Sequence, residues 1–541
     1  MVGVGVRPRR VGALHEAMFV VLLALGASWS AAAPAAAQGF VFEEEEVEQI
    51  AVSDTLARFL REGIEYYERE DFVAASIFFW RVITDPDPGA APIRPRAQFE
   101  LAKTLVRMRL VQSALFFFDD VIRTGEAHPY YEASAPWVVT IAARIPGNFD
   151  MLRRVQSFEG LFPDRIEARF HDQMAFMLGQ HFYNVGELER ALQYLGFVTE
   201  ASTFYPQALF LRGVTFIRRY DARSAAESFL RLIHLAERGR SVRDVDVQRL
   251  RELAVLSVAR TLYSTGSFER ALEYYEDIPT TSMYWLQALF EASWANYQMD
   301  RFNRALGNLH TLSSPFFEDQ FYPEAPILQA VIYFRNCRFR EVRRVLEDFR
   351  YTYEPLREAL EARMQELGTN REFFEFLASG RARSAGFDRR LQAIVNAALA
   401  DRSLTNTLAY IDIIEGEMEL VRTADRGWSN SEFARYLSDQ LAETREQTVL
   451  LAGELVRNRL DAIVQELRRR QREADAILVE TDLAEAGALT PALRAELFRG
   501  RRVEGDVDER PSAQTLWWTF DGEYWRDELG HYSYQVRSVC Q

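Results

Sequence analysis

The sequence has few of the residues that carry metal, redox or nucleophilic chemistry. Its 541 residues include two cysteines and seven histidines. The nearest pair of histidines, His171 and His181, is not spaced to place two metal ligands on one helix face. No His-Glu-x-x-His, phosphate-loop, nucleophile-elbow or dinucleotide-binding motif is present. We therefore expect no catalytic residue, no metal site and no cofactor, with a hydrolase of unrecognised motif as an alternative.

The two cysteines are too few for a disulfide framework. Cys337 lies within a helical pattern, which favours a buried small residue, and Cys540 is expected to be free or to pair between chains. In an exported protein the two residues could also form an intramolecular bridge. We expect unpaired thiols and keep the bridge as the alternative. Thiol labelling of the denatured, non-reduced protein distinguishes the two.

Lysine is also scarce, and acidic residues outnumber basic ones. The net charge is −15, and Lys103 is the only lysine. Arginine supplies the rest of the positive charge, which we interpret as the codon usage of a GC-rich bacterial genome. Because nucleic acids and anionic membrane surfaces are themselves negative, this balance does not favour either as a partner.

Long apolar runs are absent after the N-terminal segment. Three arginines precede an apolar run at residues 18–27, and small residues follow, with Ala35 and Ala37 at the two small positions before a cut. This layout is typical of a secretory signal peptide, here residues 1–37, and an uncleaved membrane anchor is the alternative. No cysteine lies near the cut, so we expect a soluble periplasmic protein that is not a lipoprotein. The acidic residues 38–50 are expected to form a linker.

Small residues recur at an interval of 34 residues. Gly179 and Gly213 form one pair, and Ala259 and Ser293 form another; each is followed by an alanine twelve residues later. A repeat of this length with small residues at fixed offsets is typical of stacked helix–turn–helix units. Related patterns begin at the small residues Gly63, Ala102, Gly179, Gly213, Ala259, Ser293 and Ala330.

The pattern resembles the tetratricopeptide repeat family over residues 51–360, with about eight units. Residues 178–183 followed by 189–192 match the family well, whereas 130–165 match it poorly. The resemblance implies an all-α solenoid in which two helices per unit stack on the next unit. Prolines are expected where helices stop, and Pro355 is expected to mark the end of the array.

The resemblance also implies a concave groove lined by the first helix of each unit. The residues at those positions are mostly aromatic or apolar, and the Lys/Asn cluster by which some family members hold a peptide carboxylate has no counterpart. We expect an apolar or amphipathic segment of a protein partner to bind there. The alternative is that neighbouring units or the chain's own C-terminal helices cover these residues. The positions are Phe176, Tyr183, Phe210, Val214, Leu256, Tyr263, Phe290, Trp294, Tyr297, Ile327 and Phe334.

A long helical region is expected over residues 361–505. Ser429–Glu432 has the form of a capping box and opens a helix that meets no proline before Pro491. A seam with alternating steps of four and three residues suggests a short coiled coil, through which the chain would form homo-oligomers. The alternative is a long helix packed along the solenoid. The seam is Val456, Leu460, Ile463, Leu467, Arg470, Ala474 and Ile477.

The C-terminal residues 506–541 differ from the rest of the chain. Five aromatic residues surround an Asp521-Gly522 pair, which is a hairpin signal, and Tyr532, Tyr534 and Val536 then alternate with polar residues. We expect a short aromatic tail, with a β-hairpin as one form, that either caps its own solenoid or contacts a partner. The contact residues would be Trp517, Trp518, Phe520, Tyr524 and Trp525.

Together these observations predict a non-enzymatic periplasmic scaffold that binds protein partners of the cell envelope. Outer-membrane assembly, wall or division complexes, and surface or motility machinery all fit, and the sequence does not choose among them. The competing prediction is a structural solenoid that assembles with its own copies through the C-terminal helix.

Overall fold

We describe the chain from a computed structural model. The expected signal peptide and acidic linker lie outside the residues that the structure describes, which are 54–145, 149–238, 247–318, 320–381, 389–399, 401–487 and 520–540. The regular structure within these ranges is helical, so the predicted all-α fold class is confirmed.

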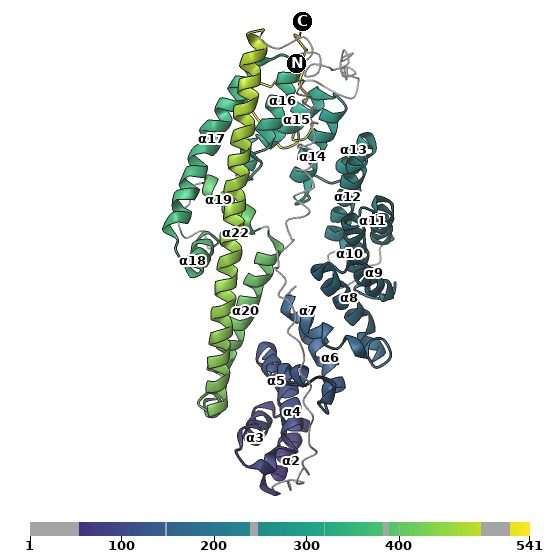
Figure 1. Ribbon diagram of the computed structural model, residues 1–541, viewed down its shortest axis with the longest axis vertical. Coiled ribbons are helices and arrows are strands. Elements are labelled where there is room, and N and C mark those ends of the chain that lie inside the picture. Colours follow the sequence, from purple (N-terminus) through teal and green to yellow (C-terminus); the bar gives the residue numbers. More distant parts are fainter. Residues whose placement is uncertain are drawn as a thin grey trace, which may run out of the picture. The chain divides into compact units, whose positions relative to one another are not determined.

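Paired helices follow one another from residue 54 to residue 366 (Figure 1). Each helix packs against the next one along the chain, and most first helices also contact the first helix of the next pair. This nearest-neighbour packing defines a helical-repeat solenoid, as the sequence predicts. The pairs are α2–α3 (Asp54–Glu68, Phe72–Thr84), α4–α5 (Arg94–Arg107, Val111–Thr124), α6–α7 (Tyr131–Ala142, Phe149–Gln156), α8–α9 (Ala168–Val185, Leu188–Phe197), α10–α11 (Tyr205–Arg218, Ala222–Glu237), α12–α13 (Val247–Ser264, Phe268–Glu276), α14–α15 (Trp285–Gln298, Phe302–Leu312) and α16–α17 (Ala325–Arg335, Phe339–Glu366).

Small residues allow the two helices of a pair to approach closely. A Cβ atom at Gly179 would lie 2.6 Å from Cγ of Leu195 on the partner helix, and one at Gly63 would lie 2.7 Å from the ring of Phe79. Ala191, twelve residues after Gly179, is completely buried on the same interface. The large apolar side chain of one helix therefore occupies the space that a larger residue on the other would need.

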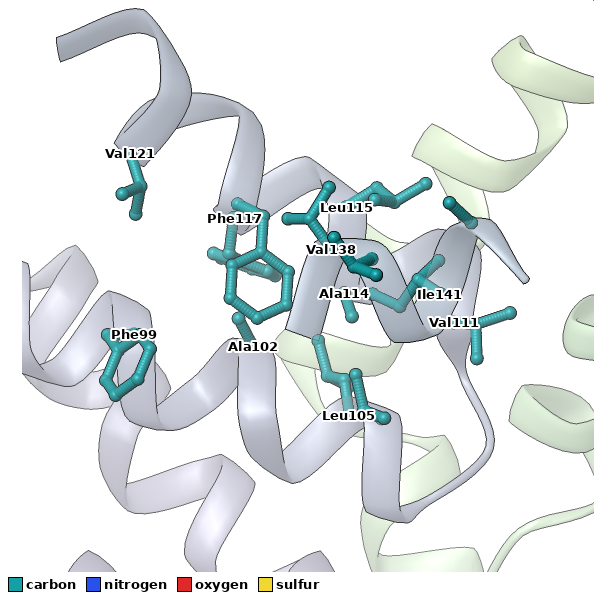
Figure 2. Packing of buried hydrophobic residues seen from close by; sticks show 14 of the residues in the cluster. Phe99, Ala102, Leu105, Val111, Ala114, Leu115, Phe117, Val121, Val138 and Ile141 are labelled. Carbon is teal, nitrogen blue, oxygen red and sulfur yellow. The ribbon is translucent and has the colours of Figure 1, made fainter. Parts of the chain in front are cut away.

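One continuous core runs through the first four pairs, from α2 to α9. Buried side chains from α4, α5 and α6 meet in one part of this core (Figure 2). Because each pair buries its apolar stripe only against its neighbours, no pair has a core of its own. The residues labelled in Figure 2 are Phe99, Ala102, Leu105, Val111, Ala114, Leu115, Phe117, Val121, Val138 and Ile141.

A left-handed residue ends the first helix in seven of the pairs. It lies seven positions after the small residue of the unit, a regularity that the sequence pattern alone did not reveal. Left-handed backbone costs most residues about 1–2 kcal/mol but is free for glycine. The residues and their φ angles are Glu70 (62°), Arg109 (67°), Gly186 (87°), Tyr220 (61°), Gly266 (78°), Asp300 (58°) and Cys337 (54°).

Replacing Gly186 with alanine is expected to lower the free energy of unfolding by about 1 kcal/mol. A Cβ atom there would meet no atom within 4 Å, so the cost comes from the backbone conformation alone. Urea denaturation followed by circular dichroism measures the change.

The same exchange at Gly416, which lies inside α20 (Arg402–Thr423), provides the control. A Cβ atom at Gly416 also meets nothing within 4 Å, but the backbone there is helical. Alanine is the better helix former, so Gly416→Ala should stabilise the protein by up to about 1 kcal/mol. Equal effects of the two exchanges would contradict the argument.

Pro355 does not stop a helix, contrary to the sequence prediction. It lies inside α17, which continues to Glu366. A proline removes one backbone hydrogen bond from a helix and normally kinks or stops it. Here the helix packs along α22 (Glu432–Glu485) on both sides of the proline, so tertiary contacts support the interrupted turn.

The long helix predicted near residue 430 is α22, but its cap is Ser431 and not Ser429, the first residue of the predicted capping box. The Ser431 hydroxyl accepts a hydrogen bond from the Ala434 amide at 3.1 Å. The helix packs along α17, α18 (Asn370–Arg381) and α20 (Figure 1). Seam residues Val456, Leu460, Ile463 and Leu467 lie in one buried cluster with apolar side chains of those helices. The seam is thus covered within the chain, so an oligomer through it would first have to open these contacts.

Charged side chains fix the antiparallel register of α17 and α22. From Arg343 to Arg350 on α17, seven residues forward correspond to seven back on α22, and the Glu361–Arg468 pair follows eleven residues forward on α17 and seven back on α22. The pairs that mark this register are Arg343–Asp482, Arg350–Asp475 and Glu361–Arg468. Because most of these side chains are substantially exposed, the pairs contribute little free energy individually, and their reversed order along the two helices marks the antiparallel register.

The hairpin of α20 and α22 also contacts the first units. The Glu417 carboxylate on α20 accepts hydrogen bonds from the amides of Gln112 at 2.5 Å and Ser113 at 3.0 Å, at the start of α5. The indole of Trp428 donates to the Ser76 hydroxyl at 2.9 Å in a buried contact. One helix, α22, therefore packs against both an early and a late part of the solenoid.

The C-terminal tail docks on the α15 and α16 units of the same chain. Cys337 and Cys540 form a disulfide bond with their Cα atoms 5.1 Å apart, so the expectation of unpaired thiols is wrong. Among the described tail residues, 520–540, no strand is present, and the expected hairpin does not form there. The alternation of Tyr532, Tyr534 and Val536 reflects instead an extended chain with one side on a helix.

Candidate partner-binding face

The predicted groove residues all lie on the first helices of the pairs from α8 to α16. Six of them are buried, at most 8% exposed, and would not reach a partner unless neighbouring residues moved: Phe176, Leu256, Tyr263, Trp294, Ile327 and Phe334. The others are half-buried: Tyr183, Phe210, Val214, Phe290 and Tyr297. A partner-binding hypothesis therefore rests on the second set.

Aromatic residues early in the first helix pack on the entrance to the next unit. The ring of Phe176 stacks on Phe204 with centroids 5.6 Å apart, and Phe290 contacts Tyr322 at 5.7 Å. Phe204 and Tyr322 directly precede the next first helix or its opening turn. These contacts account for the burial of Phe176 and for the partial burial of Phe290.

Tyrosines later in the first helix also contact the following unit. Arg218, 35 residues after Tyr183, lies with its guanidinium 4.7 Å from the tyrosine ring and donates to the Tyr183 carbonyl at 2.8 Å. Arg335 lies 5.4 Å from the ring of Tyr297 in the same way. Burial raises the pKa of the Tyr183 hydroxyl, and Arg218 opposes that rise. The aromatic stripe therefore helps to join successive units, which is the alternative that the sequence left open.

A charged pair within this stripe was missed by sequence reasoning. The Arg260 guanidinium on α12 contacts both carboxylate oxygens of Glu291 on α14, with the shortest N–O distance 2.6 Å. Burial acts to lower the pKa of Arg260, but the charge and the hydrogen bonds of Glu291 together outweigh burial and raise the pKa overall, so the guanidinium stays charged. The sequence signal for this pair was Glu291, a single acidic residue between Phe290 and the apolar residues that follow.

Metal chemistry finds no support in the described residues. No group of three histidine, cysteine or acidic side chains there is arranged to hold a metal ion. Burial lowers the pKa of His128 and of His181, so both imidazoles are neutral at neutral pH.

The predicted tail contacts are divided between described and undescribed residues. Trp517 and Trp518 lie outside the described residues. Phe520 and Tyr524 both contact the imidazole of His310 on α15, with ring centroids 4.5 and 4.9 Å away. Trp525 is 59% exposed and has most of its surface in solvent.

His310 is the centre of the tail contact, which the sequence did not indicate. Tyr532 and Tyr534 complete its surroundings, with ring centroids 4.9 and 5.6 Å from the imidazole. The Tyr534 hydroxyl lies 3.2 Å from Nδ1 of His310. Burial lowers the pKa of His310, which favours the neutral ring. The described tail thus caps its own solenoid.

Comparisons with known proteins give only weak likenesses. No protein-family model and no curated protein matches the sequence. Among solved structures, a tetratricopeptide repeat protein from Parabacteroides merdae ATCC 43184 is 12% identical, covering 55% of this chain and 93% of that one, with a TM-score of 0.26. The apo form of RapI is 11% identical, covering 73% and 99%, with a TM-score of 0.32. At this level the likeness concerns helical folds alone and identifies no partner or reaction.

None of the described helices combines the length and the apolar character that crossing a bilayer requires.

Proposed function

We propose that this protein is an exported, non-enzymatic scaffold of the cell envelope that binds a protein partner through the first-helix face of α8 to α14. The observation that carries the proposal is that half-buried aromatic side chains occupy equivalent positions on first helices of different units. Phe210 and Phe290 occupy one such position, and Tyr183 and Tyr297 occupy another. Rings that are fixed by neighbours and still partly exposed lose little entropy when they bind.

The position of α22 supports this choice of units. It packs chiefly on α17, α18 and α20, with smaller contacts on α5 and α16, whereas α8 to α13 pack chiefly against one another. Among the described residues, the C-terminal helices therefore make no extensive contact with α8 to α13.

The chemistry of the face favours an amphipathic segment. Phe210 and Val214 offer apolar surface on α10, and an arginine lies over the ring of each flanking tyrosine, Tyr183 and Tyr297. An apolar side chain would pack on the rings, and a neighbouring carboxylate would pair with a guanidinium. The N-terminal sequence pattern supports export, and the envelope is accordingly where we expect this partner.

Chemical crosslinking and capture from cell envelopes test the proposal. Phe210→Ser combined with Phe290→Ser should reduce recovery of the crosslinked partner at least about tenfold, because aromatic anchors carry much of the energy of such interfaces. Phe197→Ser is the matched control, since Phe197 is a partly exposed aromatic residue on a second helix, α9. Thermal unfolding of each variant verifies that it is folded.

Equal recovery of the partner by the double variant and by the wild type would overturn the groove hypothesis. Recovery of only a second copy of this chain would favour the competing structural homo-oligomer. Loss of recovery in the Phe197 control as well would show that the aromatic surface acts non-specifically.

A further inference from the structure

Besides the rings around His310, partly buried hydrogen bonds hold the tail on α15. Gly530 N donates to the Thr311 hydroxyl at 3.0 Å, and Val536 N donates to the Asn303 side-chain oxygen at 2.7 Å. Tyr534 N donates to the Asn303 carbonyl at 3.3 Å. Bonds of this kind contribute about 0.5–1.5 kcal/mol each, because water competes for the same groups.

The end of the tail has even fewer contacts. Val539 N donates to the Asn336 carbonyl at 3.1 Å, and Nε of Arg338 donates to the Arg537 carbonyl at 3.0 Å. Among residues 520–540 only Leu529 is buried, at 9% exposure. Beyond the rings around His310, little apolar area therefore holds the tail in place, and the disulfide at Cys540 is its strongest attachment.

The surface of α15 is nevertheless shaped for an extended chain. A Cβ atom at Gly307 would overlap the carbonyl group of Tyr532, so only glycine allows the tail backbone to lie against the helix. Asn303, one helical turn before Gly307, presents both its carbonyl and its side-chain oxygen to tail amides. His310 lies one turn beyond and receives the aromatic rings. The docking is specific even though its non-covalent contacts are few.

We propose that the Cys337–Cys540 bond is a redox-controlled lock on this tail. In the oxidised protein the tail covers the face of α15 that carries Asn303, Gly307 and His310. Thiol–disulfide exchange with a dithiol reductant breaks the protein S–S bond, leaves two protein thiols and converts the dithiol to its own disulfide. Both protein cysteines are partly exposed, which gives a reductant access. After reduction the remaining non-covalent contacts no longer keep the tail docked, and the α15 face opens.

Hydrogen exchange of the full-length protein, with and without a dithiol reductant, tests the lock. Reduction should speed exchange of the amides of Tyr534, Val536 and Val539 at least about tenfold, because exchange follows the population of the open form. Exchange in α8 to α13 should change little. Cys540→Ser should behave like the reduced protein without any reductant, and reoxidation of the wild type should restore slow exchange.

Three results would overturn the proposal. Unchanged exchange of the tail amides on reduction would show that the non-covalent contacts hold it without the bond. Equal acceleration across α8 to α13 would show that the bond stabilises the whole fold and is no lock on the tail. A dimer on a non-reducing denaturing gel would show that the bond links two chains. These outcomes do not depend on partner binding, so the proposal stands or fails separately from the proposed function.

Discussion

Replacing Arg470 with alanine is expected to lower the free energy of unfolding by about 3 kcal/mol. Arg470 is 2% exposed and is the charged residue of the α22 seam. Its guanidinium contacts the carboxylates of Glu466 at 2.6 Å, Glu473 at 2.8 Å and Glu324 of α16 at 3.1 Å. Removing the guanidinium leaves three carboxylates that repel one another at a buried contact between helices.

The neighbouring Glu324 shows how much this site depends on the arginine. Burial raises the pKa of Glu324, and Arg470 opposes that rise. Without Arg470 the carboxylate would lose its main stabilising charge, so the α16–α22 contact should weaken first. Hydrogen exchange in α16 is expected to report this before the rest of the solenoid responds.

Arg469→Ala is the matched control for the arginine prediction. Arg469 also contacts Glu466, but its side chain is 42% exposed. A surface pair of this kind contributes at most about 1 kcal/mol. Urea denaturation compares the two variants. Similar losses for both would mean that the buried arrangement around Arg470 contributes no more than a surface ion pair.

The repeating fold was predictable because its determinants are local. A small residue such as Gly179 faces a large one on the next helix, and the interval of 34 residues records that geometry in the sequence. The start of α22 was predicted to within two residues, although the hydroxyl that bonds an amide three positions on belongs to Ser431 and not to Ser429 of the predicted box. Periodicity of this kind depends on neighbours along the chain, which a sequence contains directly.

Which part of the chain packs on each apolar helix surface was not predictable in the same way. The seam at Val456 to Leu467 has the same pattern whether it meets α17 and α20 or a second molecule, because apolar spacing does not specify the partner. Pro355 is a helix stop in isolation and is tolerated here through packing against α22. The disulfide joins residues 203 positions apart, a separation at which the sequence carries no distance information.

The candidate site shows the same difference between local features, which were predictable, and tertiary contacts, which were not. The positions of Phe176 and Phe290 on first helices followed from the repeat, but the contacts with Phe204 and Tyr322 that bury them depend on how successive units stack. The burial of His310 under the tail depends on a chain segment more than 200 residues away. The sequence therefore placed these residues on first helices. The structure then separated the half-buried residues from those that are buried between successive units.

Glu417 provides the second large expected effect. This carboxylate of α20 accepts hydrogen bonds from the Gln112 amide, and from the amide and hydroxyl of Ser113. The residue that precedes α5, Leu110, has no side chain able to cap the helix. Glu417 therefore caps the start of α5 from a distant part of the chain, where the helix dipole favours negative charge.

The contribution of Glu417 to the stability of the wild type is expected to fall as the pH rises from about 5 to about 7. Burial raises the pKa of Glu417 from 4.5 to about 7, and the hydrogen bonds to α5 only partly oppose this. Between these values the folded protein keeps a proton that the unfolded chain has released, so the contribution is fully present below pH 4.5 and is lost as the pH passes 7. The loss is about 1.4 kcal/mol per pH unit across that window.

Glu417→Gln removes the titrating group and should flatten the profile between pH 5 and pH 8. Glu419→Gln is the control on the same helix: its side chain is 57% exposed, and Arg422 lowers the pKa of that carboxyl, so its contribution changes only in acid. Urea denaturation at each pH, with hydrogen exchange at the first turn of α5, measures both variants. A constant difference between wild type and Glu417→Gln across this range would show that Glu417 does not titrate there. The contact would then be an ionised cap throughout, held by the amides of Gln112 and Ser113.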